Sequence, residues 1–159
     1  MDTINHIIKT VKPQLNITTK MCNIPDILNQ LPIYTTINNL EFPLCKEGDE
    51  GIQDIYCKKK FFSNNHMNGF IIYWNSNALS PVHGHDTEGC YFKTLSNGIL
   101  EHKYKINNNT NNYIYIKTQT QPPNITQYID NSIGYHSIQN TNSHIVASIH
   151  FYQNNCLTN

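Results

Sequence analysis

The sequence predicts a mostly β, single-domain protein: a closed β-sandwich or small β-barrel preceded by a short helical lead. From residue 54 onward, short runs rich in Ile, Tyr and Phe alternate with turns that contain Gly, Asn and Pro. Many short strands with regular turn signals are typical of closed β folds. Before residue 54, apolar residues recur at helical spacing instead. A chain of 159 residues is long enough to bury one core. We therefore expect a helical lead over residues 1–50 that packs on a barrel formed by residues 51–159.

Two short helices are expected in the lead. Residues 3–12 place four apolar side chains at helical spacing, and Pro13 ends that helix. Residues 24–31 have one proline in the first turn and another just past the end, which favours a second helix. Segment 33–50 is predicted to be a loop with a possible third helical turn.

The strands follow from apolar and β-branched runs bounded by turn residues. Polar or Pro-containing segments at 63–68, 75–80, 96–98, 107–112 and 121–124 are the expected turns. The expected strands span residues 55–58, 69–74, 81–92, 99–106, 113–117, 125–129, 135–139 and 145–152.

Composition excludes several classes of protein. The net charge is zero, so nothing suggests a nucleic-acid partner. No apolar run approaches the roughly 18 residues of a membrane span, and the start does not resemble a signal peptide. The five cysteines are odd in number and irregularly spaced, which argues against a disulfide framework. We expect a reduced, cytoplasmic, monomeric protein.

Two histidines stand one residue apart in the segment that begins at Pro81. On a strand, residues i and i+2 face the same side, so His83 and His85 can point into one cavity. Tyr91 and Phe92 nearby favour a strand. Neutral imidazole is the commonest metal ligand in proteins, so this pair is a candidate for holding one metal ion.

Two later segments complement this pair. His136 follows a glycine at position 134, and residues 145–152 alternate polar with apolar side chains. Ser148, His150 and Tyr152 therefore share the polar, cavity-facing side of a predicted strand. Their spacing suggests a relay, in which the serine hydroxyl binds one histidine nitrogen and the tyrosine hydroxyl binds the other. A β fold would bring these distant strands together around a metal.

These three segments resemble the cysteine dioxygenase family, thiol dioxygenases of the cupin superfamily, over roughly residues 54–152. His83, His85 and His136 fall where that family carries its three iron ligands, and Cys90 falls where its cysteine sits. The run Ser148-x-His150-x-Tyr152 matches its Ser-x-His-x-Tyr strand, and residues 132–136 match its Ser-Ile-Gly-Leu-His segment.

The resemblance implies a cupin β-barrel with Fe(II) on three histidines. It also implies that Cys90 and Tyr152 lie close together and can become joined by a thioether bond. Trp74 matches a tryptophan near the family's site, although core packing explains it equally well. Glu88 is an alternative fourth metal ligand, and its simpler interpretation is a solvated loop carboxylate.

The sequence departs from the family pattern at the group that holds the substrate carboxylate. The family uses an arginine two residues after a tyrosine, whereas this chain contains no arginine and has Tyr56-Cys57-Lys58 there. Lys58 is the candidate replacement, with Tyr56 beside it and Lys60 as the fallback. Lysine offers a point charge instead of a planar fork, so we expect weaker carboxylate binding. The alternative is that residues 58–60 form a solvated run of charge.

The function implied by the resemblance is oxidation of L-cysteine by O2 to cysteine sulfinic acid, with a small thiol and O2 as the partners. One alternative is the same chemistry on another thiol, 3-mercaptopropionate or cysteamine. Another is a metal-binding cupin without turnover. We expect neither a nucleic-acid nor a membrane partner.

Overall fold

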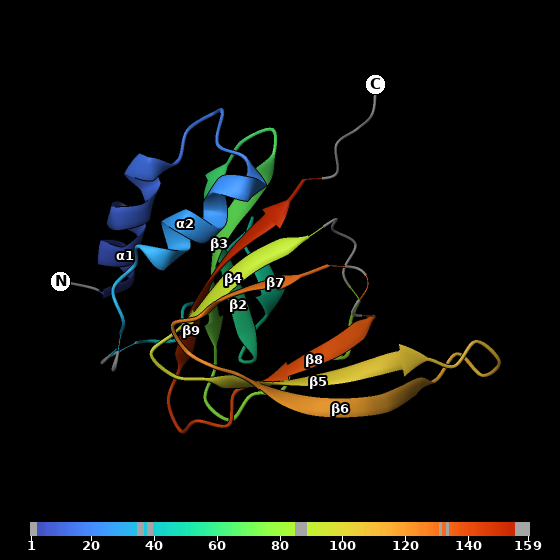
Figure 1. Ribbon diagram of the computed structural model, residues 1–159. Helices are drawn as coiled ribbons and strands as arrows, with labels where there is room; N and C mark the ends of the chain where they lie inside the picture. Colours follow the sequence, from blue (N-terminus) through green and yellow to red (C-terminus); the bar gives the residue numbers. More distant parts are fainter. Residues whose placement is uncertain are drawn as a thin grey trace.

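Two antiparallel β-sheets face each other, and the helices cover the outer face of the larger sheet (Figure 1). The computed structural model describes residues 3–34, 37, 40–84, 89–130, 132 and 134–154. Within these residues, the larger sheet has the strand order β1-β2-β3-β9-β4-β7 and the smaller one β6-β5-β8. The helical elements are α1 (Thr3–Val11), η1 (Lys12–Gln14), η2 (Met21–Asn23) and α2 (Ile24–Asn29). The strands are β1 (Glu50–Ile52), β2 (Tyr56–Ser63), β3 (Met67–Trp74), β4 (Cys90–Leu95), β5 (Ile99–Ile106), β6 (Tyr113–Gln121), β7 (Thr126–Ile129), β8 (Tyr135–Gln139) and β9 (Val146–Gln153).

This architecture confirms the predicted mostly β fold with a short helical lead. The strands do not close into one continuous barrel, and the arrangement is the jelly-roll form of the expected fold. Residues directly opposite in an antiparallel pair share a face, so the register fixes which side chains point between the sheets. Within the described part of the chain, none of the helices has the length and apolar character needed to cross a membrane.

Several element boundaries differ from the expectation. The described residues between 33 and 49 contain no helical turn, so the possible third turn is wrong there. Strand β1 was not foreseen. It is three residues long, and Gly51 (φ 148°) stands where a Cβ would collide with the carbonyl oxygen of Tyr56. Strand β4 begins at Cys90 rather than at Pro81, and β6 continues to Gln121 because it pairs with β5 along its length.

The main apolar core lies between the helices and the outer face of the larger sheet. Strand β9 alternates across that sheet, as the sequence predicted: Ile149 and Phe151 are buried in this core, while His150 and Tyr152, which alternate with them, line the cavity on the side of the smaller sheet. Further buried members come from both layers and include Ile4, Ile7, Val11, Ile24, Leu28, Met67 and Ile71. The helical lead therefore supports the strand whose opposite side carries the candidate site.

Shortening one core side chain in α1 is expected to destabilise the fold modestly. Ile7 is fully buried, and an Ile→Val change at a buried position costs about 0.5–1.5 kcal/mol of unfolding free energy. Urea denaturation of Ile7→Val would measure this cost. Ile17→Val is the matched control, because Ile17 is 75% exposed and its change should stay within about 0.5 kcal/mol. Equal effects of the two changes would mean that α1 does not pack on the sheet as described.

Candidate functional site

A small cavity of about 40 Å³ lies between the two sheets, on the inner face of β9. Both sheets contribute to its walls, as does the segment that follows β3. Both polar and apolar side chains line the cavity. The lining residues are Trp74, His83, Cys90, Phe92, Ile99, Ile129, His136, Ile138, His150 and Tyr152. Six of the residues singled out from the sequence thus meet at one place, although they are spread over almost 80 positions of the chain.

His83 and His136 face each other across the cavity. Their backbones form an isolated antiparallel bridge, with both N–H···O=C distances at 2.9 Å. This bridge, rather than a long strand through residue 83, fixes the position of His83. Gly134 (φ 78°), just before β8, takes a backbone conformation that favours glycine. The two imidazole Nε2 atoms lie 3.1 Å apart.

Hydrogen bonds at the other ring nitrogens assign the tautomers of this pair. His83 Nδ1 lies 2.9 Å from the carbonyl oxygen of Pro81, which can only accept, so Nδ1 carries the proton. His136 Nδ1 lies 3.0 Å from Glu101 Oε1, and it donates there in the same way. Burial lowers the pKa of His83, which favours the neutral ring. When both rings are neutral, the two facing Nε2 atoms present their lone pairs to the same point.

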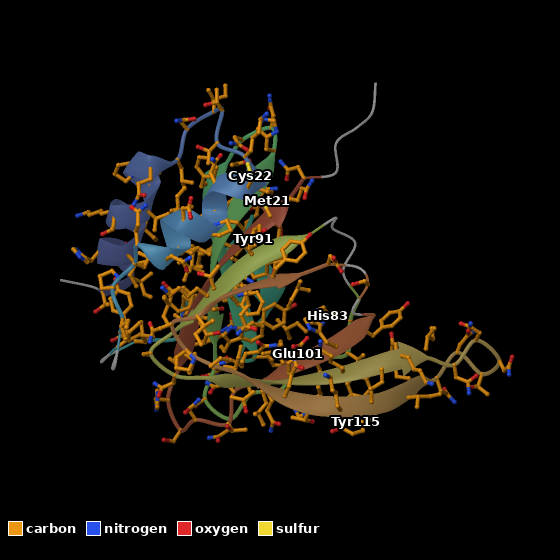
Figure 2. The ribbon with its side chains drawn as sticks, viewed as in Figure 1. Met21, Cys22, His83, Tyr91, Glu101 and Tyr115 are labelled. Carbon is orange, nitrogen blue, oxygen red and sulfur yellow. The ribbon has the colours of Figure 1, made fainter. Side chains whose placement is uncertain are left out.

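Glu101 on β5 is a functional candidate that the sequence reasoning missed. Its side chain is 1% exposed and accepts hydrogen bonds from His136, from Gln119 at 2.9 Å and from Gln121. Burial alone would raise the pKa of this carboxyl, but the hydrogen bond from His136 and the nearby charges lower it overall. Figure 2 shows Glu101 and His83 in the space between the two sheets. The signal available in the sequence was a single carboxylate on the inward face of a predicted strand.

This arrangement fits a metal ion. Two nitrogens that bind one metal at about 2.1 Å, roughly at right angles, lie about 3 Å apart, close to the observed separation of the two Nε2 atoms. A carboxylate that orients a ligating histidine through Nδ1 is the usual outer-shell partner of such a ligand. Among the described residues, no group of three His, Cys, Asp or Glu side chains is gathered closely enough to hold a metal. His85, the expected third ligand, and Glu88, the alternative one, lie outside the described residues.

A hydrogen-bonded chain runs along the inner face of β9. Ser148 Oγ lies 2.8 Å from His150 Nε2, and the Tyr152 hydroxyl lies 3.4 Å from His150 Nδ1, so the structure has both contacts of the expected relay. Trp74 Nε1 donates to Ser148 Oγ at 2.9 Å. Indole can only donate, so Ser148 accepts there and can give its own proton to His150. Trp74 thus has a polar role in addition to packing.

Cys90 and Tyr152 lie directly opposite each other on β4 and β9. Burial raises the pKa values of both the Cys90 thiol and the Tyr152 phenol, so each keeps its proton at neutral pH. Cys90 Sγ also lies 3.7 Å from His150 Nδ1. The strand register therefore brings together the pair that the family resemblance, and not the sequence pattern itself, implied to be close.

Lys58 and Tyr56 extend this face onto β2. Lys58 Nζ lies 4.6 Å from the centre of the Tyr152 ring and 4.7 Å from that of Phe70, so its charge is at the edge of the cavity. The Tyr56 ring packs on Trp74 with a centroid separation of 5.4 Å. Lys60, the fallback, is exposed and lies 5.5 Å from the Phe70 ring.

Residues 53–157 match the family model for cysteine dioxygenase type I. The chain belongs to this family. Solved structures with a similar fold include the cupin domain of Cnp3 from Schizosaccharomyces pombe, which is 14% identical with a TM-score of 0.50 and coverage of 68% of this chain and 71% of that chain. A second is oxalate decarboxylase from Lactobacillus farciminis in complex with formate, which is 11% identical with a TM-score of 0.50 and coverage of 67% and 30%. Comparison with curated proteins gives no match.

Membership of the cysteine dioxygenase type I family confirms the resemblance that was recognised from the three histidine-bearing segments. The matched range includes every site residue described above. The likeness to the solved structures, at such low identity, shows the cupin fold alone.

Proposed function

We propose that this protein is an iron-dependent thiol dioxygenase that converts L-cysteine and O2 into cysteine sulfinic acid. The observation that carries the proposal is the convergence of His83 Nε2 and His136 Nε2 in a cavity that Tyr152 and Cys90 also line. Family membership supports the reaction class. That the thiol is L-cysteine and that the metal is iron are themselves proposed here.

His83, His85 and His136 would hold the metal. Imidazole binds iron, zinc and nickel, so the choice of Fe(II) depends on the family and not on the ligand type. When bound, Fe(II) supplies the site at which a thiolate and dioxygen can meet and react. The Glu101 carboxylate keeps the His136 proton on Nδ1, and this leaves Nε2 available as a ligand.

The overall reaction adds both atoms of O2 to one sulfur: R–SH and O2 give R–SO2H, with no other reductant. The chain's own residues would orient the substrate and manage its protons. Tyr152 is held by the His150–Ser148–Trp74 chain, so its hydroxyl can donate a hydrogen bond to the reacting groups or take up a proton from them. Phe92, Ile99 and Ile138 give the cavity apolar walls, which would limit the access of water to the reacting groups.

Oxygen consumption tests the proposal directly. Protein loaded with Fe(II) under anaerobic conditions should take up O2 when L-cysteine is added, and mass spectrometry should find a product heavier than cysteine by two oxygen atoms. Uptake with 3-mercaptopropionate or cysteamine, but not with L-cysteine, would identify a different substrate for the same class of reaction. The absence of uptake with any of the three thiols, despite one bound iron per chain, would refute the enzymatic proposal and favour a metal-binding protein without turnover.

A further inference from the structure

An ion pair stands at the edge of the cavity, on the edge strand β1 of the larger sheet and its neighbour β2. Lys58 Nζ on β2 lies 2.7 Å from Glu50 Oε2 on β1. The two residues are directly opposite in the antiparallel register, so their side chains share the face that carries the site. The Lys58 side chain is 17% exposed and that of Glu50 is 56% exposed. The pair therefore spans the boundary between the site and solvent.

Lys58 is directed toward the cavity by three contacts. Its ammonium lies over the rings of Tyr152 and Phe70, in addition to its contact with Glu50. Its charge lies against the cavity wall, because the Tyr152 ring that it contacts lines the cavity. Lys59, the next residue, points to the opposite face, where it donates to Asp49 and to the carbonyl oxygen of Leu44.

The position of Glu50 is set by the backbone. Gly51 allows β1 to approach β2 so closely that any side chain at that position would collide with the carbonyl oxygen of Tyr56. The register pairs Glu50 with Lys58 and Gly51 with Cys57. The carboxylate is thus built into the sheet beside Lys58 rather than carried on a long loop.

A cation at the edge of a thiol-binding cavity is the natural partner for a substrate carboxylate. Here that cation already has a carboxylate against it. A second carboxylate brought to Lys58 would gain attraction from the ammonium but would be repelled by Glu50 a few ångströms away. A thiol without a carboxylate meets no such repulsion from Glu50, so its binding should depend little on the charge of Glu50.

On the basis of the proposed dioxygenase function, we infer that Glu50 is a specificity residue that competes with the substrate carboxylate for Lys58. The site thereby binds the carboxylate of L-cysteine less tightly than an unpaired Lys58 would, and its preference for L-cysteine over a small thiol without a carboxylate, such as cysteamine (2-aminoethanethiol), is reduced. This role belongs to a residue outside the range matched by the family model, which begins at residue 53.

The test compares wild type with Glu50→Gln, which keeps the size of the side chain and removes its charge. Initial rates of oxygen uptake are measured for L-cysteine and for 2-aminoethanethiol, so that KM and kcat are separated. We expect the KM for L-cysteine to fall by about threefold to fivefold in Glu50→Gln, the range that one partly exposed charge pair supports. The kcat for L-cysteine should not change, and the KM for 2-aminoethanethiol should change little.

Glu47→Gln is the matched control, because Glu47 is an exposed carboxylate in the loop before β1. It should change neither KM value, which separates a specific effect of Glu50 from a general change in surface charge. The difference between the two thiols should also shrink at high ionic strength, where charges near solvent are screened. Equal shifts for both thiols, or no shift for either, would overturn the inference.

A second measurement makes the inference independent of turnover. Calorimetric titration of the iron-loaded protein under anaerobic conditions gives the Kd of each thiol. If wild type shows no oxygen uptake but Glu50→Gln binds L-cysteine more tightly, the proposed reaction fails and the role of Glu50 stands. If wild type turns over but neither KM nor Kd responds to Glu50→Gln, the reaction stands and the role of Glu50 fails. If neither thiol binds, both fail.

Discussion

Replacing His136 by alanine is expected to abolish oxygen uptake with L-cysteine and to release most of the bound iron. The change removes one of the two converging Nε2 atoms. It also leaves the buried Glu101 carboxylate without its imidazole donor. Losing an outer-shell partner costs about 10- to 100-fold in metal affinity, and the loss of a ligand should cost more than that.

Iron content after gel filtration and oxygen uptake would measure these two effects separately, with circular dichroism to show that the chain still folds. His144→Ala is a suitable control. His144 is an exposed histidine that bonds Asn97 on the surface, and its removal should leave both quantities unchanged. A His136→Ala protein that retains one iron per chain and full uptake would exclude this residue from the metal site.

Replacing Glu101 by glutamine is expected to weaken iron binding by about 10- to 100-fold. An amide keeps the shape but removes the negative charge that makes His136 a stronger base. It also cannot accept from His136, Gln119 and Gln121 as two carboxylate oxygens do, because its nitrogen is itself a donor. The amide nitrogen would then face other hydrogen-bond donors, so the buried polar cluster would lose at least one hydrogen bond.

Competition with a chromophoric chelator would give the iron affinity without any need for turnover. Denaturation of the metal-free protein would separate this effect from a loss of fold stability. Glu41→Gln, at an exposed position, should leave the affinity at the wild-type value. If Glu101→Gln and Glu41→Gln bind iron equally well, then Glu101 does not orient the ligand.

The sequence predicted best where a regular alternation coincided with chemically distinctive residues. Strand β9 is the clearest case: its period of two placed Ser148, His150 and Tyr152 on one face, and the structure joins them by hydrogen bonds. The helical lead was also predictable, because α1 and α2 have apolar residues at helical spacing and are bounded by prolines. These features are local, so they can be read from neighbouring residues.

The features that the sequence did not predict depend on contacts between distant segments. Nothing in the sequence near Glu101 distinguishes it from other residues of β5. Its contacts come from distant strands, with His136 on β8 and Gln119 on β6. Strand β1 is too short to show a period, and Glu50 gains a role only when Gly51 brings it against β2. Neither contact has a local pattern from which it could be recognised.

The position of His83 also depends on a contact with a distant segment, which the sequence did not predict. The spacing of the two histidines suggested a strand beginning at Pro81, but β4 begins at Cys90 and His83 is fixed by its single bridge to His136. The placement of His85 lies outside the described residues. The prediction of which residues meet was therefore more accurate than the prediction of how the backbone brings them together.

Strand β9 belongs to two different environments at once. Its Ile149 and Phe151 side chains are packed under the helical lead, while His150 and Tyr152, which alternate with them, form the hydrogen-bonded wall of the cavity. Any loosening of the lead therefore removes the support behind the relay before it touches a reacting group. We therefore expect the lifetime of the proposed activity to depend on the helix–sheet contact on the far side of the sheet, so substitutions meant to prolong it should begin there rather than in the cavity.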